Sequence, residues 1–408
     1  MLEPVVKRCV GLDVHKMVVV ATALVEQQDG SIKEETKQFG TFRKHRRQMV
    51  RWLKGLDVEL AVMESTGIYW KSIFASLEAA GITAYVVNAR DVKKVPGRKT
   101  DVSDSKWLAD LVRVGLLSPS FIPPRDLREL RLITRYRMKV KGMLSAHSNR
   151  LHKCLDDAGI RLGGVVSDIR GVSARYIIRG LLEGKKPQEL VAHVHGRLRE
   201  KIPDLLASID EPLSERHKWL LRSIDRQITA LEQEIMDIDD YLAEQMITYK
   251  QQIELLQTIP GVDFIAAVML LVEIGPEMEC FGNAHRLASW AGMCPGNNES
   301  AGKKKSGRTR KGNATVRKVL CEIANAAVKT NSQFKGQYKG LVIRRGHKRA
   351  TVAVGHKVLR VVYALLKSLK PYMDPAIDYS QLVVKRNAPR WLSALKKYGY
   401  LPELAKAA

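Results

Sequence analysis

Short apolar runs and amphipathic stretches alternate along the first 115 or so residues of the chain. Apolar runs of this length, rich in β-branched residues and bounded by polar residues or glycine, are typical of β-strands. The longer stretches, in which apolar residues recur every three or four positions, favour helices. The pattern predicts strands at 8–14, 17–26, 31–40, 58–64 and 84–88. Helices are predicted at about 42–55, at about 68–80 and from Asp101 onward.

The order of these elements, β-β-β-α-β-α-β-α, is the order of a ribonuclease-H-like fold. In that topology the first and fourth strands lie side by side at the centre of the sheet, so the residues that end them become neighbours. Open α/β sheets place their sites at the carboxyl ends of strands. Asp13 ends the first apolar run and Glu64 ends the fourth strand.

Four acids, Asp13, Glu64, Asp101 and Asp104, are the candidate chemistry of this region. Asp101 and Asp104 are three residues apart at the start of a predicted helix, so they share one face. An acid at the end of a buried strand is costly unless it is paired or bound to a metal. Two divalent ions about 3.5–4 Å apart are the usual apparatus for cutting or joining phosphodiesters. Each acid alone has a solvated or helix-capping alternative, but as a set they predict a divalent-metal site.

Beyond a turn-rich segment at 118–124 the pattern becomes helical. The segment 125–153 carries nine basic residues, opposed only by Asp126 and Glu129. A charge bias of this kind favours contact with nucleic acid, and a solvated helix face is the alternative. The residues predicted to make this contact are Arg128, Arg131 and Arg135.

A regular apolar seam occupies residues 221–242. Its members are spaced alternately three and four residues apart, the period of 3.5 that is expected of a coiled coil. The seam favours a coiled-coil or helix-pair contact, for which a second subunit is one candidate partner. An ordinary long helix packed on its own domain is the alternative. The seam consists of Leu221, Ile224, Ile228, Leu231, Ile235, Ile238 and Leu242.

The C-terminal part begins near Leu255 with a segment, 256–262, that resembles a helix-hairpin-helix. Its Pro-Gly turn would aim backbone N–H groups at a phosphate. Residues 296–313 then form a polar, glycine-rich stretch that we expect to be a loop. A flexible positive loop is usually either a linker or an element that binds a nucleic-acid backbone. Its basic residues are Lys303, Lys304, Lys305, Arg308, Arg310 and Lys311.

Composition favours a polyanionic partner, because 68 Lys and Arg face 43 Asp and Glu in 408 residues, a formal net charge of +25 with a pI near 9.8. No stretch approaches the roughly 18 apolar residues that span a bilayer, so no membrane partner is expected. The N-terminal apolar stretch is interrupted by Asp13, His15 and Lys16, unlike a signal peptide. We therefore expect the protein in the cytoplasm, associated with the nucleoid when it acts. The five scattered cysteines, none with C-x₂-C spacing, support neither a zinc site nor a disulfide frame.

Taken together, these motifs make the chain resemble a DEDD transposase of the insertion-sequence one-ten family, whose members are viewed as RNA-guided DNA recombinases. Any one motif is weak, but all five in order are specific. The Asn-Asn-Glu-Ser-Ala-Gly form of the last motif is similar to the family's eleven-eleven branch. The matching motifs are Gly11–Lys16, Met63–Trp70, Arg98–Asp104, Thr258–Val262 and Asn298–Lys303. Asp110 lies outside them and is not included among the candidate acids.

The resemblance implies an α/β plus α architecture in which a RuvC-like mixed sheet is followed by mainly helical regions. Helices are expected to resume at 314–330 and 350–370. The implied parts are a RuvC-like DEDD catalytic domain at 1–117, a basic helical and coiled-coil region at 118–250, a C-terminal transposase domain at 251–375 and a tail at 376–408.

The resemblance also implies the chemistry. In the family the four acids bind Mg²⁺ (or Mn²⁺), and a serine of the C-terminal domain attacks DNA and holds it through a phosphoserine link. The motif maps that serine onto Ser300, with Ser306 as the reserve candidate. The family serine commonly follows another serine and precedes two glycines, whereas Glu299 and Ala301 stand beside Ser300 here.

The family also uses a structured bridge RNA and assembles as a tetramer with two DNA duplexes. The implied partners are therefore double-stranded donor and target DNA, a non-coding bridge RNA and a homo-oligomer of dimer to tetramer size. Arg98 and Lys99 precede the acids and would neutralise phosphate.

Three hypotheses for function follow from these observations. The first is an RNA-guided, site-specific DNA recombinase of an insertion sequence. The second is a ribonuclease-H-like nuclease or junction resolvase that uses metal-activated water, against which Ser300 and the basic C-terminal part speak. The third is a non-catalytic nucleic-acid-binding scaffold, against which the complete acid set speaks.

Overall fold

The computed structural model describes residues 5–65, 67–93, 95, 103–296, 298–300, 303–306, 308–309 and 311–375, with a few residues between 384 and 396. The chain divides into two compact units, Met1–Arg125 and Asp126–Ala408, and each is described here by itself. The tail expected at 376–408 lies mostly outside the described residues.

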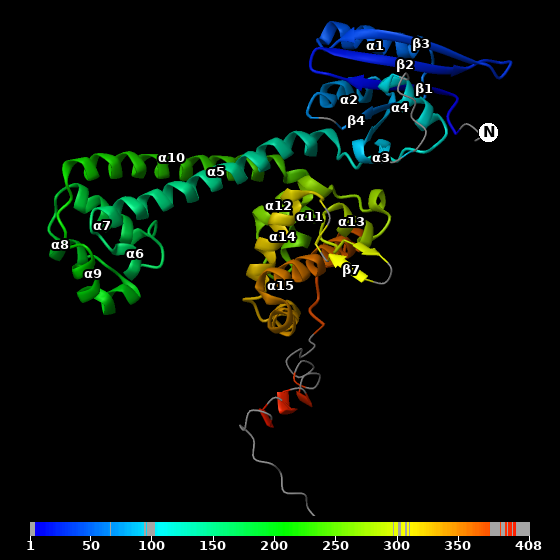
Figure 1. The fold of residues 1–408 in the computed structure, drawn as a ribbon. Helices are drawn as coiled ribbons and strands as arrows, with labels where there is room; N and C mark the ends of the chain where they lie inside the picture. The colour runs from blue at the N-terminus through cyan, green and yellow to red at the C-terminus, as the bar shows by residue number, and fades with distance from the viewer. Residues whose placement is uncertain are drawn as a thin grey trace, which may run out of the picture. The chain divides into compact units, whose positions relative to one another are not determined.

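Five strands form one mixed sheet in the first unit (Figure 1). Their order across the sheet is β3-β2-β1-β4-β5. The first three pair antiparallel, while β1 pairs parallel with β4 and β4 with β5. The ribonuclease-H-like order and the contact between the first and fourth strands are therefore confirmed. The strands are β1 (Arg8–Val14), β2 (Val18–Glu26), β3 (Ile32–Gly40), β4 (Leu60–Glu64) and β5 (Thr83–Val87).

Helices cover both faces of this sheet because successive residues of a strand point to opposite sides. Val10 and Leu12 pack against the helices α1 and α2, whereas Cys9 and Val62 pack against α4. The sequence pattern predicted α1, α2 and α4 but not the short α3. The helices are α1 (Arg43–Gly55), α2 (Trp70–Glu78), α3 (Ala89–Lys93) and α4 (Asp104–Arg113).

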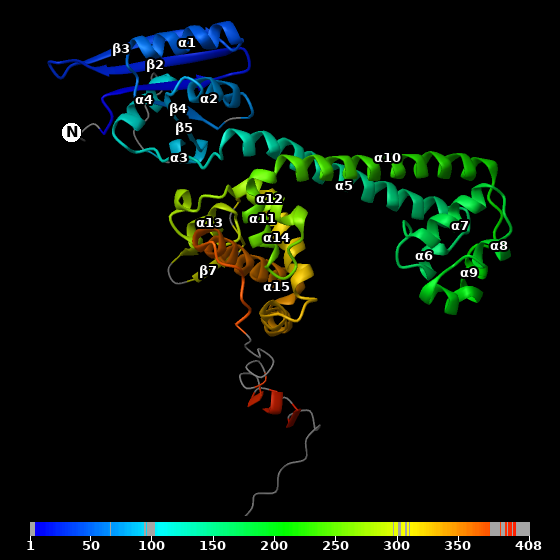
Figure 2. The ribbon, with the colours of Figure 1, turned by 180° about the vertical axis from the view of Figure 1, so that it is seen from behind.

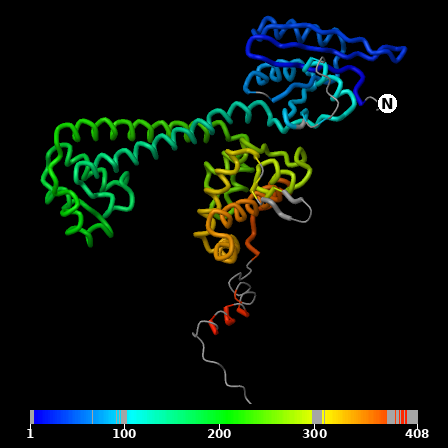
Figure 3. Tube along the Cα trace, in the orientation of Figure 1, coloured from blue at the N-terminus to red at the C-terminus, as the bar shows by residue number. Residues whose placement is uncertain are grey.

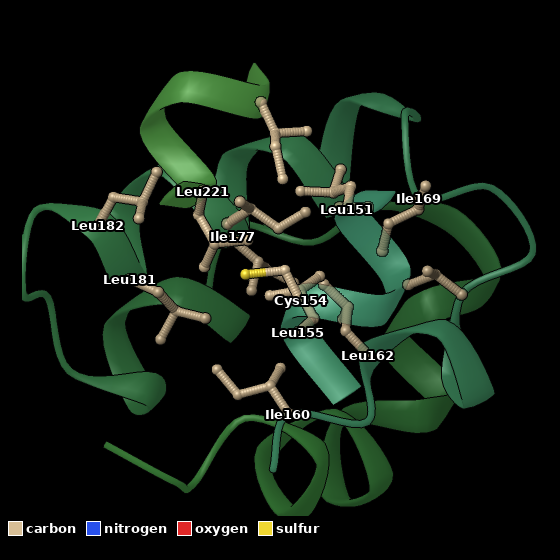
Figure 4. Close-up of a cluster of buried hydrophobic side chains, with 14 of the residues drawn as sticks. Leu151, Cys154, Leu155, Ile160, Leu162, Ile169, Ile177, Leu181, Leu182 and Leu221 are labelled. Carbon is tan, nitrogen blue, oxygen red and sulfur yellow. The ribbon is translucent and has the colours of Figure 1, made fainter. Parts of the chain in front are cut away.

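Two long helices, α5 (Arg125–Asp157) and α10 (Glu215–Gln245), run side by side in the second unit (Figures 1 and 2). Smaller helices pack between and beside them at one end, where they enclose a core of leucine, isoleucine and valine side chains (Figure 4). These smaller elements are α6 (Leu162–Val165), α7 (Val172–Leu182), α8 (Pro187–Val191), η1 (Gly196–Lys201) and α9 (Ile202–Ser208).

The apolar seam of α10 is covered by the chain itself. Leu221, Ile224, Ile228 and Leu231 are buried in one cluster with residues of α5, and Ile235 packs against the same cluster. The seam therefore packs within its own unit, against α5 and the smaller helices, which is the alternative that the sequence pattern left open. A second subunit is not needed to cover the buried part of the seam, because α5 and the smaller helices already do so.

The C-terminal part of the second unit is a helical cluster that carries a two-stranded hairpin. No described helix is long and apolar enough to cross a membrane. The tube in Figure 3 follows this part from α11 to the end of α15. Its elements are η2 (Ile247–Tyr249), α11 (Lys250–Gln257), α12 (Phe264–Ile274), η3 (Glu279–Phe281), α13 (Ala284–Trp290), β6 (Asn298–Ser300), β7 (Lys303–Ser306), α14 (Ala314–Ala327) and α15 (Gln333–Ser368).

Candidate active site and nucleic-acid interface

Asp13 and Glu64 lie at the ends of adjacent parallel strands. The register of β1 and β4 runs from Cys9 opposite Leu60 to Leu12 opposite Met63, and the next residue of each strand is the acid. The Asp13 side chain is 28% exposed, and its Oδ2 lies 3.0 Å from Nε2 of His15. The sheet therefore presents the two carboxylates at its carboxyl edge, as the sequence predicted.

The start of α4 is held tightly against β1. A Cβ on Gly11 would lie 1.9 Å from the carbonyl oxygen of Ser105, so only glycine allows this approach. The buried hydroxyls of Ser105 and Thr22 share a hydrogen bond of 2.8 Å, which joins α4 to β2. Asp104 is the first residue of α4 and follows the N-cap Ser103. These contacts bring the helix turn that carries Asp104 onto β1, the central strand, near whose end Asp13 lies.

Asp101, the fourth acid, lies outside the described residues. In the part of the chain that the structure describes, no three His, Cys, Asp or Glu side chains gather closely enough to hold a metal ion. The donor chemistry does fit a hard divalent cation, because Mg²⁺ prefers carboxylate oxygens. The metal site therefore stays a prediction that rests on strand ends and helix placement.

The candidate serine lies on a hairpin rather than in the irregular loop expected at 296–313. Ser300 ends β6 and pairs with Lys303 of β7, while the reserve candidate Ser306 pairs with Asn298 at the other end of the hairpin. The backbone N–H of Gly296 donates to the carbonyl of Arg308 at 2.9 Å and closes the hairpin's base.

A buried carboxylate that the sequence reasoning missed lies close to this base. Glu273 of α12 is fully buried and accepts two hydrogen bonds from Arg135, of 2.7 and 3.0 Å. Its Oε2 also lies 3.4 Å from Nε of Arg131 and accepts a 2.7 Å hydrogen bond from Nδ2 of Asn313. Burial lowers the pKa of Arg131 to about 10, and the charge of Glu273 opposes that shift.

This cluster ties three parts of the second unit together. Arg131 and Arg135 belong to α5, Glu273 belongs to α12, and Asn313 joins the end of the hairpin segment to α14, whose N-cap it is. The signal in the sequence was a single acid inside a helix that is otherwise apolar on every side. Two of the three arginines predicted to contact nucleic acid therefore pair with a buried carboxylate of the protein itself.

The other predicted nucleic-acid residues fall into three groups. Arg98, Lys99 and Arg310 lie outside the described residues. Lys303, Lys304 and Lys305 belong to β7, which places their backbone opposite that of β6. The remaining residues are Arg128 on α5, which is half-buried, and Arg308 and Lys311, which are exposed.

The Pro-Gly turn between α11 and α12 is directed into the protein. Gly261 has a φ of +85°, and a Cβ there would lie 2.5 Å from the backbone nitrogen of Ala327 on α14. Asp263 caps α12, since its Oδ1 accepts a hydrogen bond of 2.7 Å from the N–H of Ala266. A phosphate at this helix start would meet a carboxylate, so the geometry speaks against the phosphate contact expected of this turn.

The fold and the strand-end acids define a ribonuclease-H-like α/β domain joined to a helical C-terminal part. Family comparison agrees: a model described as "Transposase" matches residues 10–160, and one described as "Transposase IS116/IS110/IS902 family" matches residues 253–339. Together they cover more than half of the chain. The protein belongs to the IS110 family of insertion-sequence transposases, enzymes that cut and rejoin DNA.

The individual relatives also come from insertion sequences or insertion elements. The chain is 25% identical over 349 residues to the transposase for insertion sequence element IS1111A of Coxiella burnetii, which covers 84% of this chain and 86% of the relative. It is 26% identical over 151 residues to the insertion element IS900 uncharacterized 42 kDa protein of Mycobacterium paratuberculosis, 36% of this chain and 37% of that one. Among solved structures, Thermus thermophilus RuvC matches with 13% identity and a TM-score of 0.22 over 28% of this chain and 99% of RuvC.

Proposed function

We propose that this transposase is an RNA-guided, site-specific DNA recombinase that cuts and rejoins DNA through a phosphoserine intermediate. The observation that carries the proposal is the parallel register of β1 and β4, because Asp13 and Glu64 directly follow its last pair, Leu12 and Met63. Family membership supplies DNA as the substrate class. The hairpin supplies the serine: Ser300 lies on β6, and the strand paired with it, β7, contains three lysines.

Four acids, Asp13, Glu64, Asp101 and Asp104, would hold Mg²⁺ or Mn²⁺, for which carboxylate oxygens are suitable ligands. Bound there, the cation would polarise the scissile phosphate and stabilise the oxygen that leaves it. The contacts of Gly11 and Ser105 support this assignment, because they hold the start of α4 against the strand that ends in Asp13.

The serine hydroxyl is the proposed nucleophile. Its oxygen forms a bond to the phosphorus of a DNA phosphodiester, and the bond between that phosphorus and one deoxyribose oxygen breaks. The leaving oxygen takes up a proton and the serine hydroxyl loses one, so the exchange balances. Attack by a second deoxyribose hydroxyl on the phosphoserine reverses these steps and frees Ser300. The phosphodiester energy is conserved in the covalent link, so no nucleotide cofactor is required.

Specificity is proposed to lie in a structured bridge RNA that pairs with donor and target DNA, and the active assembly is proposed to be a homo-oligomer of two to four chains. The net charge of +25 supports a protein that binds several polyanions together. Sequencing the RNA that co-purifies with the protein tests the guide directly. The expected product is one structured RNA species with segments complementary to two DNA sites, and random cellular RNA is the contrary result.

The chemical test is denaturing electrophoresis of labelled DNA after reaction in Mg²⁺. Wild-type protein should yield protein-linked DNA that protease removes, and Ser300→Ala should not. If the adduct persists in Ser300→Ala but is lost in Ser306→Ala, the nucleophile is the reserve serine. Cleavage without any adduct in either variant would establish the hydrolytic nuclease instead.

The acid set is tested in the same assay. Glu64→Gln should abolish cleavage and leave the fold and nucleic-acid binding nearly intact, as should excess EDTA. Glu59→Gln is the matched control, because Glu59 is an exposed acid just before the same strand. Full cleavage by Glu64→Gln would refute the assignment.

A further inference from the structure

The longest helix of the C-terminal part is basic throughout. α15 contains nine Lys and Arg and no Asp or Glu between Gln333 and Ser368. Its buried face, which includes Val354 and Val358, packs in the helical cluster. The charges are most concentrated where residues 343–349 are all exposed. We call this segment the elbow; its basic residues are Arg344, Arg345, Lys348 and Arg349.

A break in the helix creates the elbow. Gly346 has φ +73° and ψ +165°, a non-helical conformation that other residues rarely adopt. The two parts of α15 run in different directions on either side of it (Figure 1). Two arginines therefore end the first part and a lysine and an arginine begin the second, so one corner of the molecule carries all four charges.

Neighbouring contacts fix the elbow in place. Tyr338 of the first part and His347 of the second share a hydrogen bond of 2.8 Å between the hydroxyl and Nδ1. Ala350 is fully buried, and Thr351 donates to the side chain of Asn325 on α14 at 3.4 Å. The corner is thus anchored from both sides of the break, which reduces the ordering cost of binding a partner there.

These charges have no partner within the described protein. Elsewhere in the second unit arginines meet acids: the half-buried Arg175 pairs with Glu232, and the exposed Arg179 pairs with Asp225. In the part of the chain that the structure describes, no carboxylate pairs with any of the four elbow cations. Lys348 and Arg349 also begin a helical part, where a positive charge is unfavourable to the helix dipole. Arg344 and Arg345 end the first part, where the helix dipole favours a positive charge, so helix stability explains only half of this arrangement, whereas a polyanion accounts for all four charges.

We propose that the elbow binds the phosphate backbone of duplex DNA. That the partner is DNA rests on the proposed function. The positive charge of the elbow does not depend on that proposal. The exposed segment 343–349 contains no Phe, Tyr or Trp on which unpaired bases stack, so its chemistry favours a duplex backbone over a single strand. Contacts of this kind position a duplex without reading its sequence.

The test replaces Arg344, Arg345, Lys348 and Arg349 by Gln in the full-length protein and measures binding to a 30-base-pair DNA duplex of random sequence across a range of salt concentrations. Each lost phosphate contact lowers the salt slope by about 0.9, so the slope should fall by about 3 to 4. A control variant loses the same charge at four exposed residues of the same unit: Lys186→Gln, Arg197→Gln, Arg216→Gln and Arg226→Gln. The control slope should stay at the wild-type value.

Equal slopes in the wild type and the elbow variant, or equal losses in the elbow and control variants, would overturn the proposal. A duplex RNA of the same length forms a second arm. If the elbow variant lowers the salt slope for duplex RNA but not for duplex DNA, the DNA assignment is overturned and the elbow binds RNA instead. The serine adduct is scored separately at saturating protein. If the wild type forms no serine adduct but the salt slope still depends on the elbow, the proposed chemistry is refuted and the elbow interface is supported.

Discussion

Removing the carboxylate of Glu273 should destabilise the C-terminal part of the protein more than any surface change there. In Glu273→Leu the side chain keeps a similar volume but loses its charge. Arg131, Arg135 and Asn313 then lose an acceptor that is fully buried in the wild type. The side chain of Arg131 is only 16% exposed, so its charge stays in a poorly solvated place with backbone carbonyls as acceptors but without the carboxylate.

Breaking a buried ion pair by removing one partner costs about 3–5 kcal/mol. Arg135 is 45% exposed and can turn to water, so the lower end of this range applies, about 3 kcal/mol. Because 1.4 kcal/mol is a factor of ten in an equilibrium constant, local opening should become roughly 100-fold more frequent. A chain with two compact units does not unfold in one step, so the free energy is best measured locally by native-state hydrogen exchange of α12 and α14.

The matched control is Glu279→Gln, which changes an exposed acid a few residues further along the chain. A triple variant, with Arg131→Met and Arg135→Met added to Glu273→Leu, should recover part of the lost protection, because the buried positive charge that lost its carboxylate is also gone. If α12 and α14 exchange no faster in Glu273→Leu than in Glu279→Gln, the reasoning about the buried ion pair is refuted.

Three further changes test other parts of the structure. Gly11→Ala places a Cβ 1.9 Å from a carbonyl of α4 and should abolish DNA cleavage and lower the melting temperature, whereas Gly55→Ala, which meets nothing within 4 Å, should do neither. Ile228→Asp buries a charge at a position that is 1% exposed, so it should lower the free energy of unfolding by several kcal/mol in thermal or urea unfolding. Ile247→Asp is the control, because Ile247 is 69% exposed. An unchanged melting temperature of Ile228→Asp with a smaller particle in light scattering would instead favour a seam between subunits. Burial raises the pKa of Asp110, so its contribution to stability is present at acid pH and is lost as pH rises through the raised pKa. Asp110→Asn should therefore have a higher melting temperature than wild type at pH 7, and the difference should shrink toward pH 4. A difference that does not change with pH would contradict this.

Most of the first unit could be predicted because its signals are local. Strands with alternating or continuous apolar residues can only be buried in a sheet, and their order limits the topology to few choices. The neighbourhood of Asp13 and Glu64 followed from that order. The close approach at Gly11 did not, because a glycine inside a strand indicates that something comes near without saying which backbone does.

The break in α15 escaped prediction for a related reason. Residues 333–349 carry basic residues without a clear apolar face, and helical periodicity became visible only from about residue 350. The seam of α10 shows a different limit of prediction from sequence. Its period of 3.5 identified the buried face, but the period is the same whether the partner is α5 or a second chain.

The arginines of this protein show why charge alone does not identify a nucleic-acid contact. The lone acid in α12 indicated that some cation must accompany it, and the nine basic residues of 125–153 offered many. Tertiary structure brings Arg131 and Arg135 to the buried carboxylate of Glu273, which pairs both of them within the protein. Elbow cations, with no acid on their own helix and none paired with them in the described structure, have no such structural partner. In a chain with a charge of +25 the candidates for phosphate contact are therefore the exposed cations that the fold leaves without a carboxylate, and the elbow meets that condition.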